Sequence, residues 1–302
     1  KSEVRCPKIP RYWETSDLGP RTSDFINDRG LNNYKQTATM LKEYGQEFIY
    51  KLINPIIKLF IHLGITPNMI TSMGLILNIV AAGILMYGAE YGSRNDLRYI
   101  GWAGVVILLA GVFDMMDGRL ARMGNLSSKF GALYDSVLDR YSELFMFLGI
   151  CYYLISHDYF LSSMFAFIAM MGSVMVSYTR ARAEGLGVDC SVGWMQRPER
   201  ILIIGISAIL CGVFSYFFGG DFKIPLFSLV NFETISIFTF PLSILAIMAN
   251  QTALKRLRHS KKELEAEESV NRAQKKKKEP EFHKMGTTNN KKKQTSIGFQ
   301  GR

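Results

Sequence analysis

The sequence is poor in the residues that cross-link chains or bind soft metals. Its 302 residues include four cysteines and four histidines. The cysteines are far apart, form no CxxC pair and have no histidine at a metal-ligand spacing. A disulfide framework needs a regular cysteine set, and a structural zinc site needs closely spaced ligand pairs. The sequence therefore argues against both kinds of site.

The chain also has almost no net charge before residue 251. Its formal charge is +10, yet residues 251–302 alone hold 15 basic and 6 acidic residues. The sequence pI of about 9.4 therefore reflects a basic C-terminal segment. A folded nucleic-acid-binding domain would instead spread basic residues over its surface. We expect no nucleic-acid partner.

Apolar residues are abundant and gathered in blocks, and 48% of the chain is hydrophobic. A helix needs about 17 to 25 apolar residues to cross a bilayer, where a helix also satisfies its own backbone. This pattern predicts an all-α integral membrane protein with six transmembrane helices. The six blocks are 69–89, 99–113, 131–155, 159–178, 201–218 and 234–250.

The distribution of cations predicts the orientation and the domain limits. Most lysines and arginines near helix ends fall in loops on one side, which places both termini in the cytoplasm of a cell (inner) membrane. Because the chain opens on Lys1 instead of Met, we expect its start to be trimmed or processed. We expect a polar segment, an interfacial amphipathic helix, a six-helix domain and a basic, disordered tail that binds membrane lipid. Their ranges are 1–40, 41–66, 67–258 and 259–302.

Four carboxylates stand at helical spacing where the second and third spans meet. The i,i+3 and i,i+4 spacings put each pair on one helix face, so two neighbouring helices can aim all four at one point. Hard divalent cations with oxygen ligands would neutralise them, and we expect one or two Mg²⁺ or Mn²⁺ ions. The alternative is a set of ordinary helix-end charges that reach water. The four residues are Asp114, Asp117, Asp135 and Asp139.

These aspartates belong to the pattern D-x-x-D-G-x-x-A-R-x8-G-x-x-x-D-x-x-x-D, which the chain matches without a gap from Asp114 to Asp139. The pattern resembles the signature of the CDP-alcohol phosphatidyltransferases, and the similarity extends to about residue 258. In that family a CDP-linked donor passes its phosphoryl-bearing group to an alcohol and releases CMP. The resemblance implies CDP-diacylglycerol as donor and a homodimeric protein.

The resemblance also implies a role for each matched position. All four aspartates would hold the metal, with Asp139 as a shared ligand. Asp139 would also be the catalytic base that takes the proton of the acceptor hydroxyl. The CDP moiety would lie against Gly118, Ala121, Arg122 and Gly131.

A second polar group lies at the cytoplasmic ends of the later spans. Several fixed guanidinium groups suit a dianionic phosphate, although each arginine could instead be a cytoplasmic anchor. The S-Y-x-[RK]-A-R-A-E and R-P-E-R segments are similar to those of prokaryotic phosphatidylinositol-phosphate synthases, which implies a phosphorylated polyol, inositol 1-phosphate, as acceptor. That branch has lysine where this chain has Arg180. The residues are Ser177, Arg180, Arg197, Arg200 and Arg256.

Other functions stay open at this stage. Glycerol 3-phosphate as acceptor would make the protein a phosphatidylglycerophosphate synthase. Membrane prenyltransferases also bind diphosphate through aspartates and Mg²⁺, but they normally carry two separated Asp-rich motifs. A cation transporter could use the four carboxylates, but it would leave the glycines, Ala121 and Arg122 of the motif unexplained. Donor-dependent CMP release distinguishes the transferase from the last two.

Overall fold

A computed structural model describes residues 53–190, 192–193, 195–227 and 230–295. The chain divides into two units, Lys1–Leu59 and Phe60–Arg302. The predicted polar segment 1–40 and residues 41–52 of the predicted interfacial helix lie outside the described residues. Within residues 53–66, the described part of the predicted interfacial helix, the structure has a short apolar helix, Ile53–His62.

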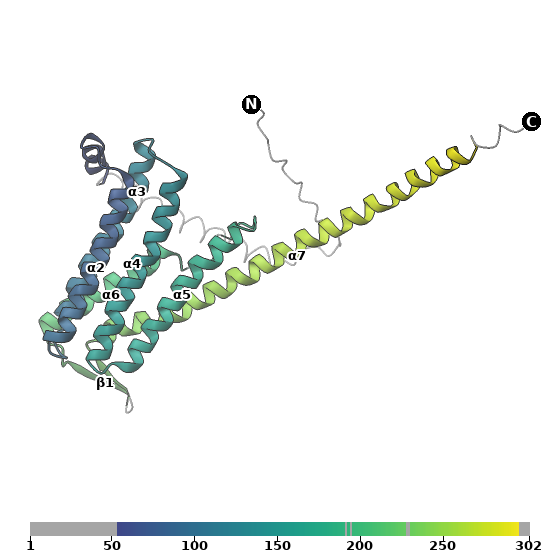
Figure 1. The fold of residues 1–302 in the computed structure, drawn as a ribbon. Coiled ribbons are helices and arrows are strands. Elements are labelled where there is room, and N and C mark those ends of the chain that lie inside the picture. Colours follow the sequence, from purple (N-terminus) through teal and green to yellow (C-terminus); the bar gives the residue numbers. More distant parts are fainter. Residues whose placement is uncertain (1–52, 191, 194, 228–229, 296–302) are drawn as a thin grey trace, which may run out of the picture. The chain divides into compact units, whose positions relative to one another are not determined.

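Six long helices build the second unit (Figure 1). Each predicted apolar block falls on one of them, so the blocks are correctly predicted as helices. The predicted all-α fold class is confirmed, and the one addition in the described residues is a short two-stranded antiparallel hairpin that joins the last two helices. The elements are α2 Pro67–Tyr91, α3 Arg98–Met123, α4 Lys129–Ser156, α5 Phe160–Glu184, α6 Arg197–Phe218, β1 Lys223–Phe227, β2 Val230–Glu233 and α7 Ser236–Thr295.

Local sequence explains where several helices begin. Pro67 stands in the first turn of α2 and Pro198 in the first turn of α6. Proline suits this position because its fixed φ matches the helix and no hydrogen bond is lost by its missing N–H. Ser128 caps α4, and its Oγ accepts a hydrogen bond of 2.9 Å from the Gly131 backbone N–H. The start of α4 is therefore fixed beside the aspartate motif.

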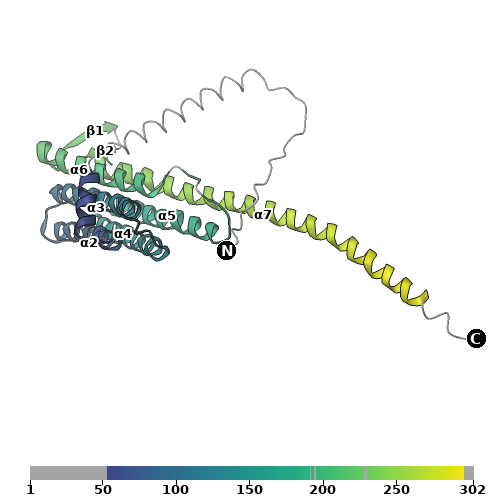
Figure 2. The ribbon, with the colours of Figure 1, turned by 90° about the horizontal axis from the view of Figure 1, so that it is seen from above.

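The six helices close into a ring. α2 packs against α3 and α4, α3 against α6, α6 against α7, α7 against α5, and α5 against α4. Figures 1 and 2 show α5 and α7 side by side. One apolar cluster with members from all six helices fills the ring, including Ala81, Ile107, Phe147 and Leu245. The ring positions residues that are far apart in sequence around a common end.

Glycines allow the closest approach within the ring. A Cβ added to Gly212 of α6 would lie 2.5 Å from the Cα of Gly101 on α3. Two backbones can touch in this way only when both residues lack side chains, which is typical of packed membrane helices. The α3–α6 contact therefore depends on this glycine pair.

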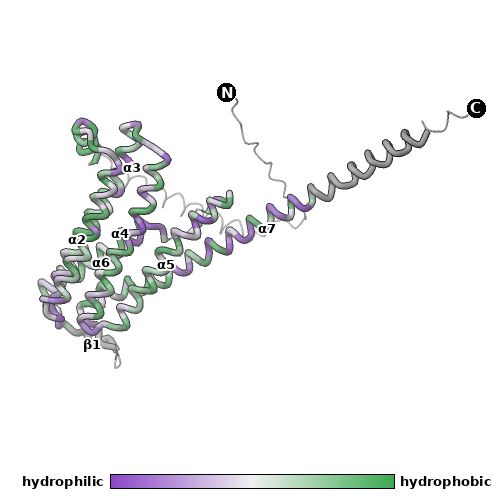
Figure 3. The backbone as a smooth tube through the Cα atoms, viewed as in Figure 1, coloured by the Kyte–Doolittle hydropathy of each residue, from purple (hydrophilic) through white to green (hydrophobic). Residues whose placement is uncertain are grey.

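The outer surface of the ring is apolar. Large side chains such as Trp102 and Tyr216 are 65% and 75% exposed, and so much exposed apolar surface indicates a lipid environment. Five helices are long and apolar enough to cross a membrane, namely α2, α3, α5, α6 and α7 over Ser236–Ala273. Figure 3 shows hydrophobic residues along most of α2 and α6. α4 has 28 residues but carries several charges near its first turns, so the described residues show five such helices where the sequence predicts six.

The structure differs from the prediction of a disordered tail. α7 continues without a break through residues 259–295, and residues 296–302 lie outside the described residues. Ion pairs at i,i+4 spacing support its first polar turns: Lys261 Nζ lies 3.6 Å from Glu265 Oε1, and Arg272 Nη2 lies 3.2 Å from Glu268 Oε2. The composition of residues 259–302 predicts disorder, but composition alone contains no information on the i,i+4 spacing of these charges.

Candidate functional site

Three of the four motif aspartates converge at one end of the ring, where α3 ends and α4 begins. One carboxylate oxygen each from Asp114, Asp135 and Asp139 lie within 4.8 Å of one another. Asp114 comes from α3 and the other two from α4, so the predicted convergence of two helix faces is present. Clustered carboxylate oxygens are the ligands that Mg²⁺ and Mn²⁺ prefer. The donor set therefore fits a hard divalent cation.

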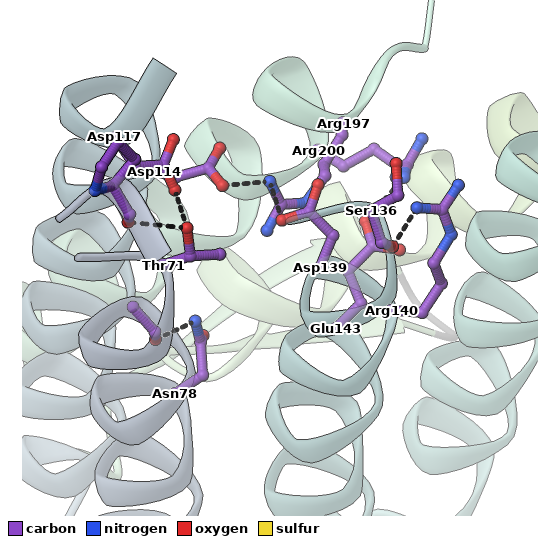
Figure 4. A network of polar contacts seen from close by, with 12 residues as sticks. Thr71, Asn78, Asp114, Asp117, Ser136, Asp139, Arg140, Glu143, Arg197 and Arg200 are labelled. Carbon is purple, nitrogen blue, oxygen red and sulfur yellow. Dashed lines mark hydrogen bonds and ion pairs between the residues drawn. The ribbon is translucent and has the colours of Figure 1, made fainter. Parts of the chain in front are cut away.

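Asp117 lies outside this trio and is oriented by another helix. Its Oδ2 accepts a hydrogen bond of 2.7 Å from Thr71 Oγ1 of α2 (Figure 4). Both side chains are buried, so the carboxylate has one fixed direction. The motif does not reveal Thr71, because 46 residues separate the two positions and only the fold brings them together.

Arg197, the first residue of α6, lies between two of the clustered aspartates. Its Nη1 is 2.6 Å from Asp114 Oδ1 and 2.9 Å from Asp139 Oδ1, as Figure 4 shows. The sequence predicts a phosphate-binding role for this arginine. In the structure it is the counter-ion of these two aspartates, so it links Asp114 of α3 with Asp139 of α4.

A first cavity, of about 240 Å³, adjoins the aspartates between the start of α2, the end of α3 and the start of α4. Asp117 and Asp135 form part of its wall. At Gly131 an added Cβ would lie 3.0 Å from Ser128 Oγ, so a larger residue would crowd the cap of α4. All four residues predicted to contact the CDP moiety line this cavity: Gly118, Ala121, Arg122 and Gly131.

A second cavity, of about 360 Å³, is enclosed by α4, α5, the start of α6 and α7. Asp139 lines it and so connects it with the aspartate cluster. All five residues predicted for the acceptor phosphate line it: Ser177, Arg180, Arg197, Arg200 and Arg256. Arg140 of α4 lines it as well, so the wall carries guanidinium groups from four helices.

The arginines of this second cavity are held in different ways. Arg256 is buried, and its Nε and Nη1 donate to the backbone oxygens of Val192 and Val176 at 2.8 and 2.7 Å. Arg180 is exposed, and its Nε lies 2.8 Å from Glu184 Oε1. The cavity therefore combines a rigid buried cation with a solvent-facing one.

Glu143 is a cavity residue that the sequence prediction missed. Its Oε1 lies 2.6 Å from Arg200 Nη2, and both side chains are buried. A signal was present, because Glu143 follows Asp135 and Asp139 at the same i,i+4 interval and therefore lies on the same helix face. The motif ends at Asp139 and so does not include it.

The chain matches a known protein family and several named relatives. The sequence profile of the family described as CDP-alcohol phosphatidyltransferase matches residues 64–248. The phosphatidylinositol phosphate synthase of Mycobacteroides abscessus is 31% identical over 171 residues, which cover 56% of this chain and 74% of that protein. The archaetidylinositol phosphate synthase of Pyrococcus horikoshii is 35% identical over 153 residues, covering 50% and 73%.

Solved structures share the fold. The phosphatidylinositol phosphate synthase of Mycobacterium tuberculosis with CDP-DAG bound matches with a TM-score of 0.55 at 24% identity, over 70% of this chain and 94% of that chain. The same enzyme in complex with manganese and citrate matches with a TM-score of 0.54 at 24% identity, over 68% and 87%. At this identity the likeness concerns the fold.

Proposed function

The chain belongs to the CDP-alcohol phosphatidyltransferase family, and from this membership we propose that it transfers the phosphatidyl group of CDP-diacylglycerol to inositol 1-phosphate and releases CMP. The observation that carries the proposal is the pair of cavities on either side of one aspartate cluster. A group transfer needs a donor and an acceptor in reach of the same reacting phosphate. Two chemically different cavities that share one carboxylate cluster meet that need.

The first cavity is the proposed donor site. Gly118 leaves room for a phosphate to approach the backbone, because an added Cβ there would meet only Arg122 Nη1, at 3.9 Å. Arg122 supplies a cation for that phosphate. Asp114, Asp135 and Asp139 would hold one or two Mg²⁺ or Mn²⁺ ions, with Asp117 as a further ligand. A bound ion of this kind stabilises the charge on the donor pyrophosphate and on the departing CMP.

The second cavity is the proposed acceptor site. Arg180, Arg197, Arg200 and Arg256, with Ser177, would bind the acceptor phosphate through charge-assisted hydrogen bonds. Asp139 lines this cavity and also belongs to the cluster, so its carboxylate would remove the proton from the attacking hydroxyl. The names of the relatives support a phosphorylated inositol as acceptor.

We also propose a membrane arrangement. At about 1.5 Å per residue, the 28 residues of α4 are long enough to form the sixth span. Its charged first turns would lie at the membrane surface beside the aspartates. The cation-rich helix ends at the site would face the cytoplasmic side of the inner membrane. A water-soluble acceptor would then enter from the cytosol. Family resemblance supports a homodimer.

The test of this function is CMP release by the purified protein in detergent with CDP-diacylglycerol and Mg²⁺. Inositol 1-phosphate, glycerol 3-phosphate, serine and free inositol are compared as acceptors. The proposal predicts release with inositol 1-phosphate. Release only with glycerol 3-phosphate would keep the metal site and replace the acceptor, whereas release with none would contradict the proposed donor.

A further inference from the structure

Glu143 lies in the wall of the acceptor cavity, one helical turn beyond Asp139. It is 3% exposed and its partner Arg200 is 1% exposed. A carboxylate so deep in a helix ring is costly unless it is paired. Glu143 is paired at 2.6 Å with Arg200 Nη2, so the two side chains orient each other. Figure 4 shows both residues beside Asp139.

The guanidinium of Arg200 is held at two points. Nη2 is fixed by Glu143, and Nη1 donates to the backbone oxygen of Met195 at 3.1 Å. Its Nε is buried and has no protein partner in the described part of the chain. A planar group anchored at two nitrogens cannot rotate, so the remaining N–H groups have a fixed direction beside the cavity.

We propose that Glu143 is a positioning residue for the acceptor: it holds Arg200 in the orientation that binds the acceptor phosphate. This inference rests on the proposed function and deepens its acceptor site. Without the carboxylate, the Met195 carbonyl would be the one anchor of the Arg200 guanidinium among the described residues, and the guanidinium could turn away. Glu143 does not line the donor cavity, so its effect should be confined to the acceptor.

Two conservative variants separate position from charge. Glu143→Asp keeps the charge but shortens the side chain by one methylene, so the bond to Arg200 is lost. Glu143→Gln keeps the length and an accepting oxygen but removes the charge. We expect Glu143→Asp to raise the KM for inositol 1-phosphate about tenfold, in the range of coupled contacts, with the KM for CDP-diacylglycerol unchanged. Glu143→Gln should stay within about threefold of wild type for both substrates.

A binding measurement and a double variant complete the test. Inositol 1-phosphate alone should raise the unfolding temperature of the wild-type protein, and by less in Glu143→Asp. In the Arg200→Lys background, Glu143→Asp should add nothing to the acceptor KM, because its target is already gone. Glu90→Asp, an exposed position at the opposite end of the ring, is the matched control and should change neither KM.

Three results would overturn the proposal. The first is an unchanged acceptor KM in folded Glu143→Asp. The second is a tenfold rise of the acceptor KM in Glu143→Gln. The third is an equal rise of the acceptor KM and the donor KM in Glu143→Asp. If Glu143→Asp does not fold, the acceptor KM of Glu143→Gln still tests the proposal. The acceptor panel separates this inference from the proposed function. If wild type uses glycerol 3-phosphate, the function fails and Glu143 is judged by that KM; use of serine or free inositol only would contradict both.

Discussion

At the residue scale, the four aspartates differ in their neighbours although the motif treats them alike. Asp114 and Asp139 share the guanidinium of Arg197, whereas Asp117 is held by the hydroxyl of Thr71. Asp139 alone combines membership of the cluster with a place in the acceptor cavity. Position therefore distinguishes a proposed base from proposed ligands that have the same chemistry.

Replacing Asp139 with asparagine tests that distinction. The amide keeps the size of the side chain but cannot accept the proton of the acceptor hydroxyl. We expect CMP release to fall by about 10²- to 10⁴-fold, while the unfolding temperature stays near that of wild type. Steady-state CMP release and a thermal unfolding curve measure both. Full activity in the folded variant would rule out Asp139 as the base.

Thr71 should affect the affinity of the site for its metal ion. Thr71→Val removes the hydroxyl that orients Asp117 while it keeps the side-chain shape. We expect affinity for Mn²⁺ to fall about 10- to 100-fold, the usual cost of losing a group that orients a ligand. Thr71→Ser retains the hydroxyl and is the control. Equal Mn²⁺ titration curves for Thr71→Val and wild type would show that Asp117 needs no such support.

The sequence predicts these residues unevenly, for a physical reason. The aspartates lie on two consecutive helices, so helical spacing alone brings their faces together. Thr71 lies 46 residues before Asp117, and its contact depends on how α2 packs against α3. Arg200 was predicted to bind phosphate, but its buried partner Glu143 was not, because burial is a property of the closed ring.

At the element scale, close helix packing rests on small residues. The backbones of α3 and α6 touch at Gly101 and Gly212, and α6 carries Arg197 and Arg200 at its first turn. A change in the separation of these two helices would therefore move arginines relative to Asp114. Packing in the middle of the ring is coupled to geometry at its end.

Gly212→Ala adds one methyl group where no space exists, 2.5 Å from the Cα of Gly101. We expect destabilisation of about 1 to 3 kcal/mol, as for other overpacked contacts, seen as a lower unfolding temperature in detergent. Gly83→Ala makes the same chemical change on α2, where an added Cβ meets nothing within 4 Å. Equal unfolding temperatures for the two variants would contradict the tight α3–α6 contact.

The apolar blocks predict where the helices lie because hydrophobic run length is a local property. The hairpin β1–β2 was not predicted, since its short segment between two spans has no strong periodicity. The sixth span was predicted over 234–250 and a disordered tail from residue 259, yet α7 continues to Thr295. Composition alone does not reveal how charged residues at i,i+4 spacing support a helix.

At the scale of the whole molecule, the site lies at one end of the ring and the hairpin follows the opposite end of α6. The proposed orientation puts the site end in the cytoplasm. In a chain with no other cysteine, Asp221→Cys near the hairpin should react with a membrane-impermeant maleimide added to spheroplasts, whereas Ser127→Cys at the site end should react only after lysis. The reverse pattern would invert the proposed topology.

The proposed function requires one aspartate cluster to serve two separate cavities, and the KM values for donor and acceptor in two arginine variants test this requirement. Arg122 lines the first cavity and Arg180 the second, and both are exposed enough to be replaced without a buried gap. Arg122→Ala should raise the KM for CDP-diacylglycerol about tenfold and leave that for inositol 1-phosphate unchanged; Arg180→Ala should do the opposite. If both variants raise the same KM, donor and acceptor do not bind in separate cavities, and the proposed function of the two cavities is wrong.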